Sequence, residues 1–221
     1  MQNADPGEKQ QKALPVCVYR ELYRVAKVHN DTSSDLDSAV TNILTLSFFF
    51  CMRSCKYSEV QGERRTKLLC VRNISFFDEN NRDISKNTLI LHQAASVTLT
   101  FEFQKRDVRN AIILHQRSND LQGEGEMCPV KAAAAIVQRR YIQYTPSKFQ
   151  DTQINLDRSG DMLYTIPSTT FLQRIRLIVD SLGQEKLGFT SAGVGTHSNF
   201  SGGAMGMFLA GTPVYKIMLM G

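Results

Sequence analysis

Apolar residues recur at helical spacing in two segments near the start of the chain. In the first, large apolar side chains follow one another every three or four residues, at Leu14, Val18, Leu22 and Val25. This is the spacing of one face of an α-helix, and Pro15 is tolerated in a first turn. We predict a helix from about Leu14 to Val28.

The second segment begins with a helix start signal. Ser34, with Asp37 three residues later, matches the sequence pattern of a capping box. Apolar residues then recur at Leu36, Val40, Ile43 and Leu44 and continue through FFFCM. We predict a second helix that runs toward Arg53.

The pattern then changes from helical spacing to short runs rich in β-branched and aromatic residues. The runs are KLLCVRNISFF, NTLILHQ, ASVTLTFEF and VRNAIILHQ, separated by polar or short linkers. In the third run Val97, Leu99, Phe101 and Phe103 alternate with Thr98, Thr100, Glu102 and Gln104. We predict a small antiparallel meander of these runs, with one face on the core and the other in water.

Helical spacing returns after the meander. One stretch begins at Pro129 and has apolar residues at Val130, Ala133, Ala134, Val137 and Tyr141. A second stretch ends at Gly183 and has apolar residues at Phe171, Ile175, Ile178 and Leu182. A third follows a Gly-rich loop and has apolar residues at Met205, Phe208, Leu209, Val214, Ile217 and Met218. The sequence therefore predicts a mostly helical α+β fold with a small antiparallel meander, over residues 13–221. Residues 1–12 lack large apolar side chains and read as a disordered tail.

Composition narrows the class of protein. The chain has 221 residues, 42% of them hydrophobic, and a net charge of +5. Its longest apolar stretch falls short of the roughly 20 residues that span a bilayer, and its N-terminus has no signal-peptide pattern. The five cysteines are odd in number and lack paired spacing, which favours reduced thiols. We expect an intracellular protein without a membrane partner, nuclear if its source is a eukaryote.

Basic residues cluster on both sides of the central predicted strands. The first cluster holds Arg53, Lys56, Arg64, Arg65, Lys67 and Arg72, and the second holds Lys105, Arg106, Arg109 and Arg117. A solvated surface explains such clusters, and so does a surface that follows a phosphate backbone. Charge alone leaves the two interpretations about even.

The order of motifs favours the second interpretation. An apolar helix is followed by Met52-Arg53-Ser54-Cys55, a basic meander, Lys105 in a hairpin turn, and Gly195-Thr196-His197-Ser198 before a helix of small residues. This order resembles the catalytic domain of tyrosine recombinases, the phage integrase-like enzymes. The segments FFFCMRSCKYSEV, CPVKAAAAIV and GTHSNFSGGAMGMFLAGTPVYKIMLMG most resemble the eukaryotic, transposon-associated members of this family.

The resemblance implies a site and a chemistry. In this family a tyrosine attacks a DNA phosphodiester, two arginines and a histidine balance the charge of the transition state, and a lysine protonates the leaving oxygen. Arg53, Lys105 and His197 match three of these positions, although a second alignment puts Lys56 in place of the first arginine. Arg64, Arg65, Lys67, Arg106 and Arg109 are the expected DNA contacts. The implied partner is double-stranded DNA, and assembly of copies on DNA stays open.

Two departures from the family pattern predict loss of cleavage. Phe200 stands where the second arginine is expected, and phenylalanine donates no hydrogen bond. The resemblance also places the nucleophile beyond Gly221, while Tyr215, at helical spacing with Val214 and Met218, is expected to pack in the interior. No earlier tyrosine fits the nucleophile's place in the motif order.

The sequence lacks the residue patterns of metal-binding and nucleotide-binding sites. The histidines are far apart, Cys51 and Cys55 lack partner ligands, and the glycines near Gly195 lack nucleotide-binding spacing, so no metal or cofactor is expected. Ser201, Gly202, Gly203, Ala204 and Gly206 predict a helix that approaches its neighbours closely. The main hypothesis is an impaired recombinase domain of mobile-element origin, truncated before its nucleophile. The alternatives are a DNA-binding module without chemistry and a decayed mobile-element fragment.

Overall fold

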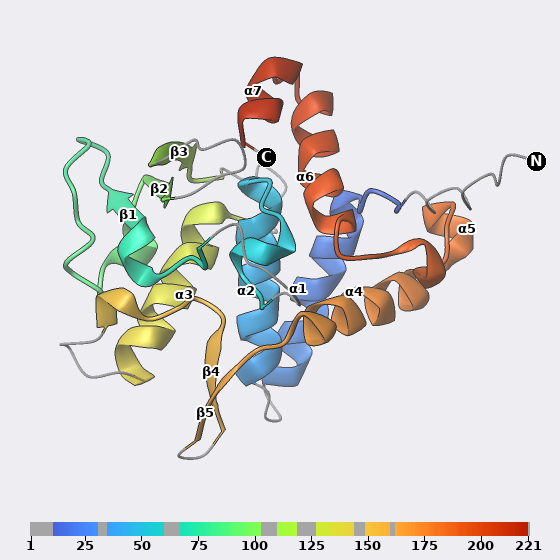
Figure 1. The fold of residues 1–221 in the computed structure, drawn as a ribbon, viewed down its shortest axis with the longest axis horizontal. Helices are drawn as coiled ribbons and strands as arrows, with labels where there is room; N and C mark the ends of the chain where they lie inside the picture. The colour runs from blue at the N-terminus through green and yellow to red at the C-terminus, as the bar shows by residue number, and fades with distance from the viewer. Residues whose placement is uncertain are drawn as a thin grey trace, which may run out of the picture.

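The computed structural model describes residues 11–30, 35–59, 67–102, 110–118, 127–143, 149–159 and 162–220. Its α-helices are α1 (Val16–Asn30), α2 (Asp35–Phe49), α3 (Pro129–Gln143), α4 (Ser168–Leu182), α5 (Gln184–Leu187), α6 (Ser198–Leu209) and α7 (Val214–Met220). Its strands are β1 (Ile74–Phe77), β2 (Ser96–Phe101), β3 (Ala111–Gln116), β4 (Leu156–Ser159) and β5 (Met162–Thr165). The predicted α+β class, mostly helical with a small antiparallel sheet, is confirmed (Figure 1).

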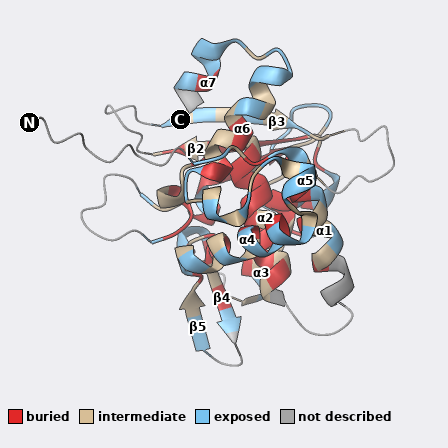
Figure 2. Cartoon of the chain, turned by 90° about the vertical axis from the view of Figure 1, so that its right-hand side faces the viewer, coloured by how far each residue is buried: buried red, intermediate tan, exposed pale blue. Residues whose placement is uncertain are grey.

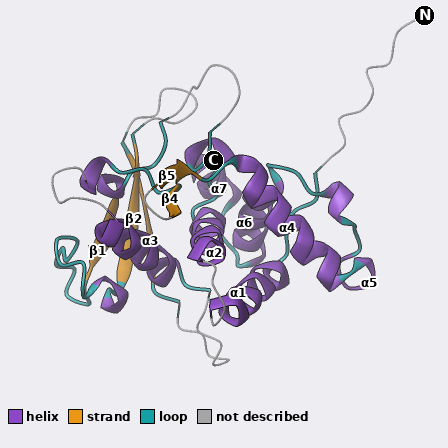
Figure 3. Ribbon diagram, turned by 90° about the horizontal axis from the view of Figure 1, so that it is seen from below, coloured by secondary structure: helices purple, strands orange, loops and turns teal. Residues whose placement is uncertain are grey.

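Helix α2 lies at the centre of the molecule. It contacts α1, α3 and α6, and Figures 1 and 3 place the three-stranded sheet and α1 on opposite sides of it. Ile43, Leu44 and Leu46 are completely buried, and so is the polar Ser47. Figure 2 shows buried residues concentrated on this helix. A helix that is apolar on most of its circumference belongs in a core, and the sequence of α2 fits that position.

The end of α2 differs from the prediction that the helix runs toward Arg53. The N–H of Met52 donates to the carbonyl of Ser47 at 2.8 Å, and the N–H of Cys51 donates to that of Phe48 at 3.3 Å. These two bonds form a Schellman motif, whose C′ residue adopts a left-handed conformation. Cys51 has φ 45°, so the helix stops at Phe49 although the apolar run continues.

The three-stranded sheet is an antiparallel meander in the order β1-β2-β3. Strand β2 is central, and Val97, Leu99 and Phe101 are buried as predicted. The opposite face is only partly in water, because neighbours on both sides leave Thr98 just 8% exposed. One prediction was wrong: residues 87–93 form turns and a 3-10 helix (η3, Leu91–Gln93), not a strand, and bury Leu91 without strand alternation.

The later helices form where the spacing predicted them. Helix α4 ends at Gly183, which has φ +79°, and buries Phe171, Ile175 and Ile178. The prediction that Tyr215 packs in the interior was wrong. Tyr215 is 62% exposed, and its helical neighbours Val214 and Met218 are 55% and 70% exposed, because α6 and α7 extend beyond the rest of the molecule (Figure 1).

The hairpin of β4 and β5 was not predicted. It is anchored to α3 by Asp157, which is 1% exposed and accepts a hydrogen bond from Arg139 at 2.6 Å. Burial raises the pKa of Asp157, but the hydrogen bond and charge of Arg139 outweigh it and leave this pKa below its usual value. None of the helices in the described part of the chain combines the length and apolar character needed to span a bilayer.

Helix α6 approaches the backbone of its neighbours, which confirms its predicted packing role. A Cβ atom on Gly202 would lie 2.4 Å from the carbonyl oxygen of Leu14, and one on Gly203 would lie 2.2 Å from that of Phe48. Both distances are far inside van der Waals contact. Glycine is therefore required at these two positions by contact with other segments.

We expect Gly203→Ala to destabilise the chain by about 1–3 kcal/mol, since α6 must move away from Phe48 to accept the methyl group. The matched control is Gly206→Ala, whose Cβ would meet only the Phe48 ring, at 3.1 Å. It should be neutral or stabilising, because alanine favours helix by up to about 1 kcal/mol over glycine. Urea unfolding of both variants measures the difference. Equal effects would contradict the close approach.

Candidate functional site

Arg53 lies against the first turn of α6. After the Schellman motif the chain is extended at Arg53, with φ −70° and ψ 150°, and enters the 3-10 helix η1 (Ser54–Lys56). The guanidinium carbon of Arg53 lies 5.4 Å from the centre of the Phe200 ring, a cation–π contact. Phe200 is three residues after His197, the N-cap of α6. The fold thus brings Arg53 to the end of α6 that carries His197 and Phe200.

A small pocket lies beside this contact. It is bordered by η1, α4 and the start of α6, and its lining residues are Ser54, Tyr57, Ser58, Ser168, Phe171, Leu172, Ile175, Gly195, Thr196 and Asn199. Ser54 and Thr196, the sequence neighbours of Arg53 and His197, both line it. Arg53, His197 and Phe200 themselves are not among its lining residues.

Lys56, the alternative to Arg53, points to a different part of the fold. Its side chain is 9% exposed, and its Nζ lies 5.3 Å from the centre of the Phe101 ring on β2. Burial lowers the pKa of Lys56, the nearby Arg53 lowers it further, and Cys55 opposes them. Arg53 therefore contacts the first turn of α6, and Lys56 contacts β2.

A buried polar network fixes the first turn of α6. The Tyr19 hydroxyl donates to Oδ1 of Asn199, whose Nδ2 donates to Oγ of Ser47. The Ser47 hydroxyl donates in turn to the carbonyl of Leu44 at 2.8 Å. Asn199 is 1% exposed and joins α1, α2 and α6. Sequence reasoning missed this network, although the one serine inside the apolar run of α2 was a signal for it.

Neither tyrosine at this site is suited to act as a nucleophile. Burial raises the pKa of Tyr57 far above its ordinary value, and a hydrogen bond with Ser47 offsets only part of the rise. Burial likewise raises the pKa of Tyr19. A phenol must lose its proton to attack phosphorus, and these two hold theirs firmly. Tyr19 and Tyr57 are therefore poor candidates for a nucleophile.

The N-terminal segment packs against the loop before α6. The backbone N–H of His197 donates to Oε1 of Gln11 at 2.8 Å, and the N–H of Lys12 donates to the carbonyl of Gly193 at 2.9 Å. Residues 1–10 of the predicted tail lie outside the described residues. At Gln11 and Lys12 the tail prediction was wrong, since these residues satisfy polar groups around His197, whose side chain is exposed.

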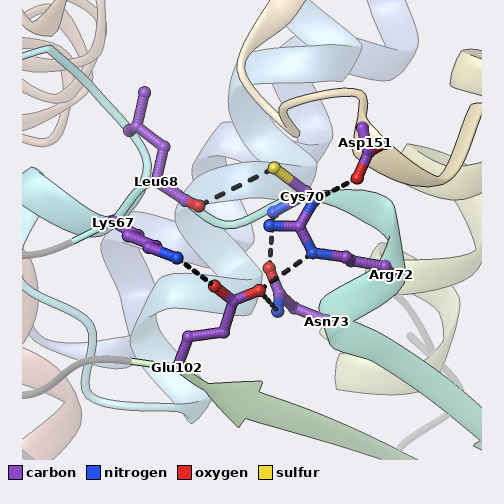
Figure 4. A network of polar contacts seen from close by, with 7 residues as sticks. All are labelled: Lys67, Leu68, Cys70, Arg72, Asn73, Glu102 and Asp151. Atoms are coloured by element: carbon purple, nitrogen blue, oxygen red, sulfur yellow. Dashed lines mark hydrogen bonds and ion pairs between the residues drawn. The ribbon is translucent and has the colours of Figure 1, made fainter. Parts of the chain in front are cut away.

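The predicted DNA contacts fall mostly outside the described residues, namely Arg64, Arg65, Arg106 and Arg109, and so does the predicted catalytic residue Lys105. Lys67 is described, and its Nζ lies 3.1 Å from Oε2 of Glu102, which directly follows β2 (Figure 4). Segments 60–66 and 103–109 join the described structure at Lys67 and Glu102. The described residues that follow the first basic segment and precede the second are therefore in contact.

Glu102 is the centre of a larger network (Figure 4). Its Oε1 accepts hydrogen bonds from Nε of Arg72 at 2.9 Å and from Nδ2 of Asn73 at 3.0 Å, and Arg72 also pairs with Asp151. Hydrogen bonds from Arg72, Asn73 and Lys67 lower the pKa of Glu102 to about 2. Sequence reasoning missed Glu102, because it was assigned only to the water-facing side of a strand.

All five cysteines lie in the described residues and are free thiols, as predicted. Within the described ranges, no group of three or more His, Cys, Asp or Glu residues could hold a metal ion. Comparison of the chain with protein-family models, curated proteins and solved structures found no match.

Glu102→Gln gives a pH-dependent change in stability. The pKa of Glu102 is about 2 when folded and 4.5 as its ordinary value, so its ionised form stabilises the fold above pH 4.5 and this contribution fades as the pH falls toward 2. We expect the difference in unfolding free energy between the parent chain and Glu102→Gln to be largest near pH 7 and to shrink between pH 4.5 and 2. Urea unfolding at several pH values measures it. A constant difference down to pH 3 would contradict the network.

Proposed function

We propose that this chain is a DNA-binding domain of the tyrosine-recombinase type that binds duplex DNA without cleaving it. The observation that carries the proposal is the contact between Arg53 and Phe200 beside His197. Arg53, His197 and Phe200 are the three positions that the resemblance assigns to charge stabilisation at the phosphate. In the fold His197 and Phe200 lie at the start of α6, and Arg53 contacts Phe200 there. One of the three is a phenylalanine.

Phe200 accounts for the absence of cleavage in this proposal. An arginine would direct N–H donors to the phosphoryl oxygens, whereas a phenyl ring has none. Loss of one such donor lowers rates by roughly a hundred- to a thousandfold. The ring also contacts the guanidinium of Arg53. The general-acid role of Lys105 rests on the resemblance, since this residue lies outside the described residues.

The basic residues account for the DNA partner. Arg64 and Arg65 belong to the segment that ends at Lys67, and Lys105, Arg106 and Arg109 belong to the segment that follows Glu102. Lys67 and Glu102, the described residues next to these two segments, form an ion pair. The number of cations in the two segments supports binding to a phosphate backbone, which depends on charge more than on sequence.

The first test is the salt dependence of duplex binding. We expect Arg64→Ala with Arg65→Ala to flatten the slope of log affinity against log salt by about two units, because each lost phosphate contact removes about 0.9. Adding Lys67→Ala should change it by less than one further unit, since Glu102 already pairs with Lys67. Fluorescence anisotropy of a labelled duplex measures the slope.

The matched control for this test removes two charges elsewhere. Arg24 and Lys186 lie on α1 and α5, on the side of α2 away from the three-stranded sheet (Figures 1 and 3). Replacing both by Ala should leave the slope close to that of the parent chain. Equal slopes in the two double variants would remove this surface from the proposal, and an absence of duplex binding by the parent chain would overturn the proposed function.

The second test is covalent trapping. Incubated with a nicked duplex that traps covalent intermediates, the chain should form no protein–DNA adduct, because Phe200 offers no donor and Tyr19 and Tyr57 retain their protons. Phe200→Arg alone should not restore cleavage, since residues that act as a unit do not contribute independently. An active tyrosine recombinase on its own nicked site serves as the positive control. An adduct mapped to any tyrosine of the unmodified chain would overturn this account.

A further inference from the structure

We propose that Lys67, Arg72 and Asn73 form a phosphate-binding cradle and that the Glu102 carboxylate occupies it as an internal competitor of DNA. The inference rests on the proposed function and adds a residue that limits DNA affinity. Sequence reasoning gave Glu102 no role, and Arg72 only a place in the basic cluster. The structure brings both into one cluster of polar groups (Figure 4).

Three donors converge on one carboxylate in this cluster. Nζ of Lys67 lies 3.1 Å from Oε2 of Glu102, while Nε of Arg72 and Nδ2 of Asn73 lie 2.9 Å and 3.0 Å from Oε1. The orientation of the Asn73 amide is fixed, because its Oδ1 accepts the backbone N–H of Cys70 at 2.8 Å. Donors held in place around an oxyanion suit a phosphate group as well as a carboxylate.

The two cations of the cradle are accessible from solvent, whereas Asn73 at its base is only 5% exposed. The side chains of Lys67 and Arg72 are 62% and 40% exposed, and that of Glu102 is 23% exposed. Ion pairs that are open to solvent contribute little net stability, so a phosphate can replace the carboxylate at small cost. The low pKa of Glu102 keeps it charged at neutral pH, and a change of pH in that range does not open the cradle.

The balance of charge explains why Glu102 opposes DNA binding. Two cations, Lys67 and Arg72, face two anions, Glu102 and Asp151, so the cluster carries no net charge. In the sequence, Lys67 directly follows residues 60–66 and Glu102 directly precedes residues 103–109. Neutralising Glu102 releases one positive charge toward an approaching phosphate, whereas a purely positioning role would make Glu102 necessary for binding. The two roles predict opposite effects of replacing Glu102 on DNA affinity: a competitor predicts tighter binding, and a positioning residue predicts weaker binding.

The experiment compares duplex binding by the full chain and by Glu102→Gln over a range of salt concentrations. We expect the variant to bind roughly three- to tenfold more tightly near 0.1 M salt, with a slope steeper by about one unit, which corresponds to one added phosphate contact. Glu185→Gln, on α5 at the opposite end of the molecule from the sheet, makes the same change in net charge and should leave the slope unchanged. The triple variant Lys67→Ala, Arg72→Ala, Glu102→Gln should lose the gain.

Equal or weaker duplex binding by Glu102→Gln, with circular dichroism showing a folded chain, would overturn the cradle. A second measurement separates this outcome from failure of the proposed function. If neither protein binds duplex, inorganic phosphate is titrated while the side-chain NMR signals of Arg72 and Asn73 are followed. Saturable shifts in Glu102→Gln, weaker in the parent chain, would support the cradle while the proposed function falls. An absence of shifts in the variant would overturn the cradle as well.

Discussion

The contact of α6 with two backbone carbonyls is the constraint on which the candidate site depends. Gly202 and Gly203 leave no room for a Cβ atom against the carbonyl oxygens of Leu14 and Phe48, so the backbone of α6 packs directly against the segment before α1 and against α2. The Asn199 side chain also forms hydrogen bonds with Tyr19 on α1 and Ser47 on α2. The turn that carries His197 and Phe200 is therefore held by packing and by buried hydrogen bonds together.

The Schellman motif at the end of α2 decides which cation meets this turn. A helix continuing to Arg53 would carry the residues after Phe49 around its own axis, whereas the left-handed Cys51 ends it and leads an extended chain into η1. Arg53 then contacts Phe200, and Lys56 is buried against Phe101. The two residues that compete for one role in the sequence thus receive different environments. The difference lies in backbone geometry, since both side chains are basic and only three positions apart.

The electrostatic properties of the polar cluster around Glu102 depend on ion pairing more than on the number of charges. A net charge of +5 suggests an attraction for polyanions, but Lys67 and Arg72 are already engaged by Glu102 and Asp151. A cation paired within the chain attracts a phosphate less than an unpaired one does, because its field is partly cancelled at short range. The electrostatic field of this cluster is therefore set by Glu102 and Asp151 as much as by Lys67 and Arg72.

The sequence by itself determined the fold class and most helices, because helical spacing and stop signals such as Gly183 act within a few residues. It also identified the small-residue face of α6. Local patterns failed at residues 87–93, at the end of α2 and at Tyr215, where burial depends on segments far along the chain. Only the tertiary structure joined Asn199 to Tyr19, 180 positions away, and Glu102 to Lys67, 35 positions away. Such contacts leave no periodic trace in a single sequence, since each partner alone has the pattern of an ordinary polar residue.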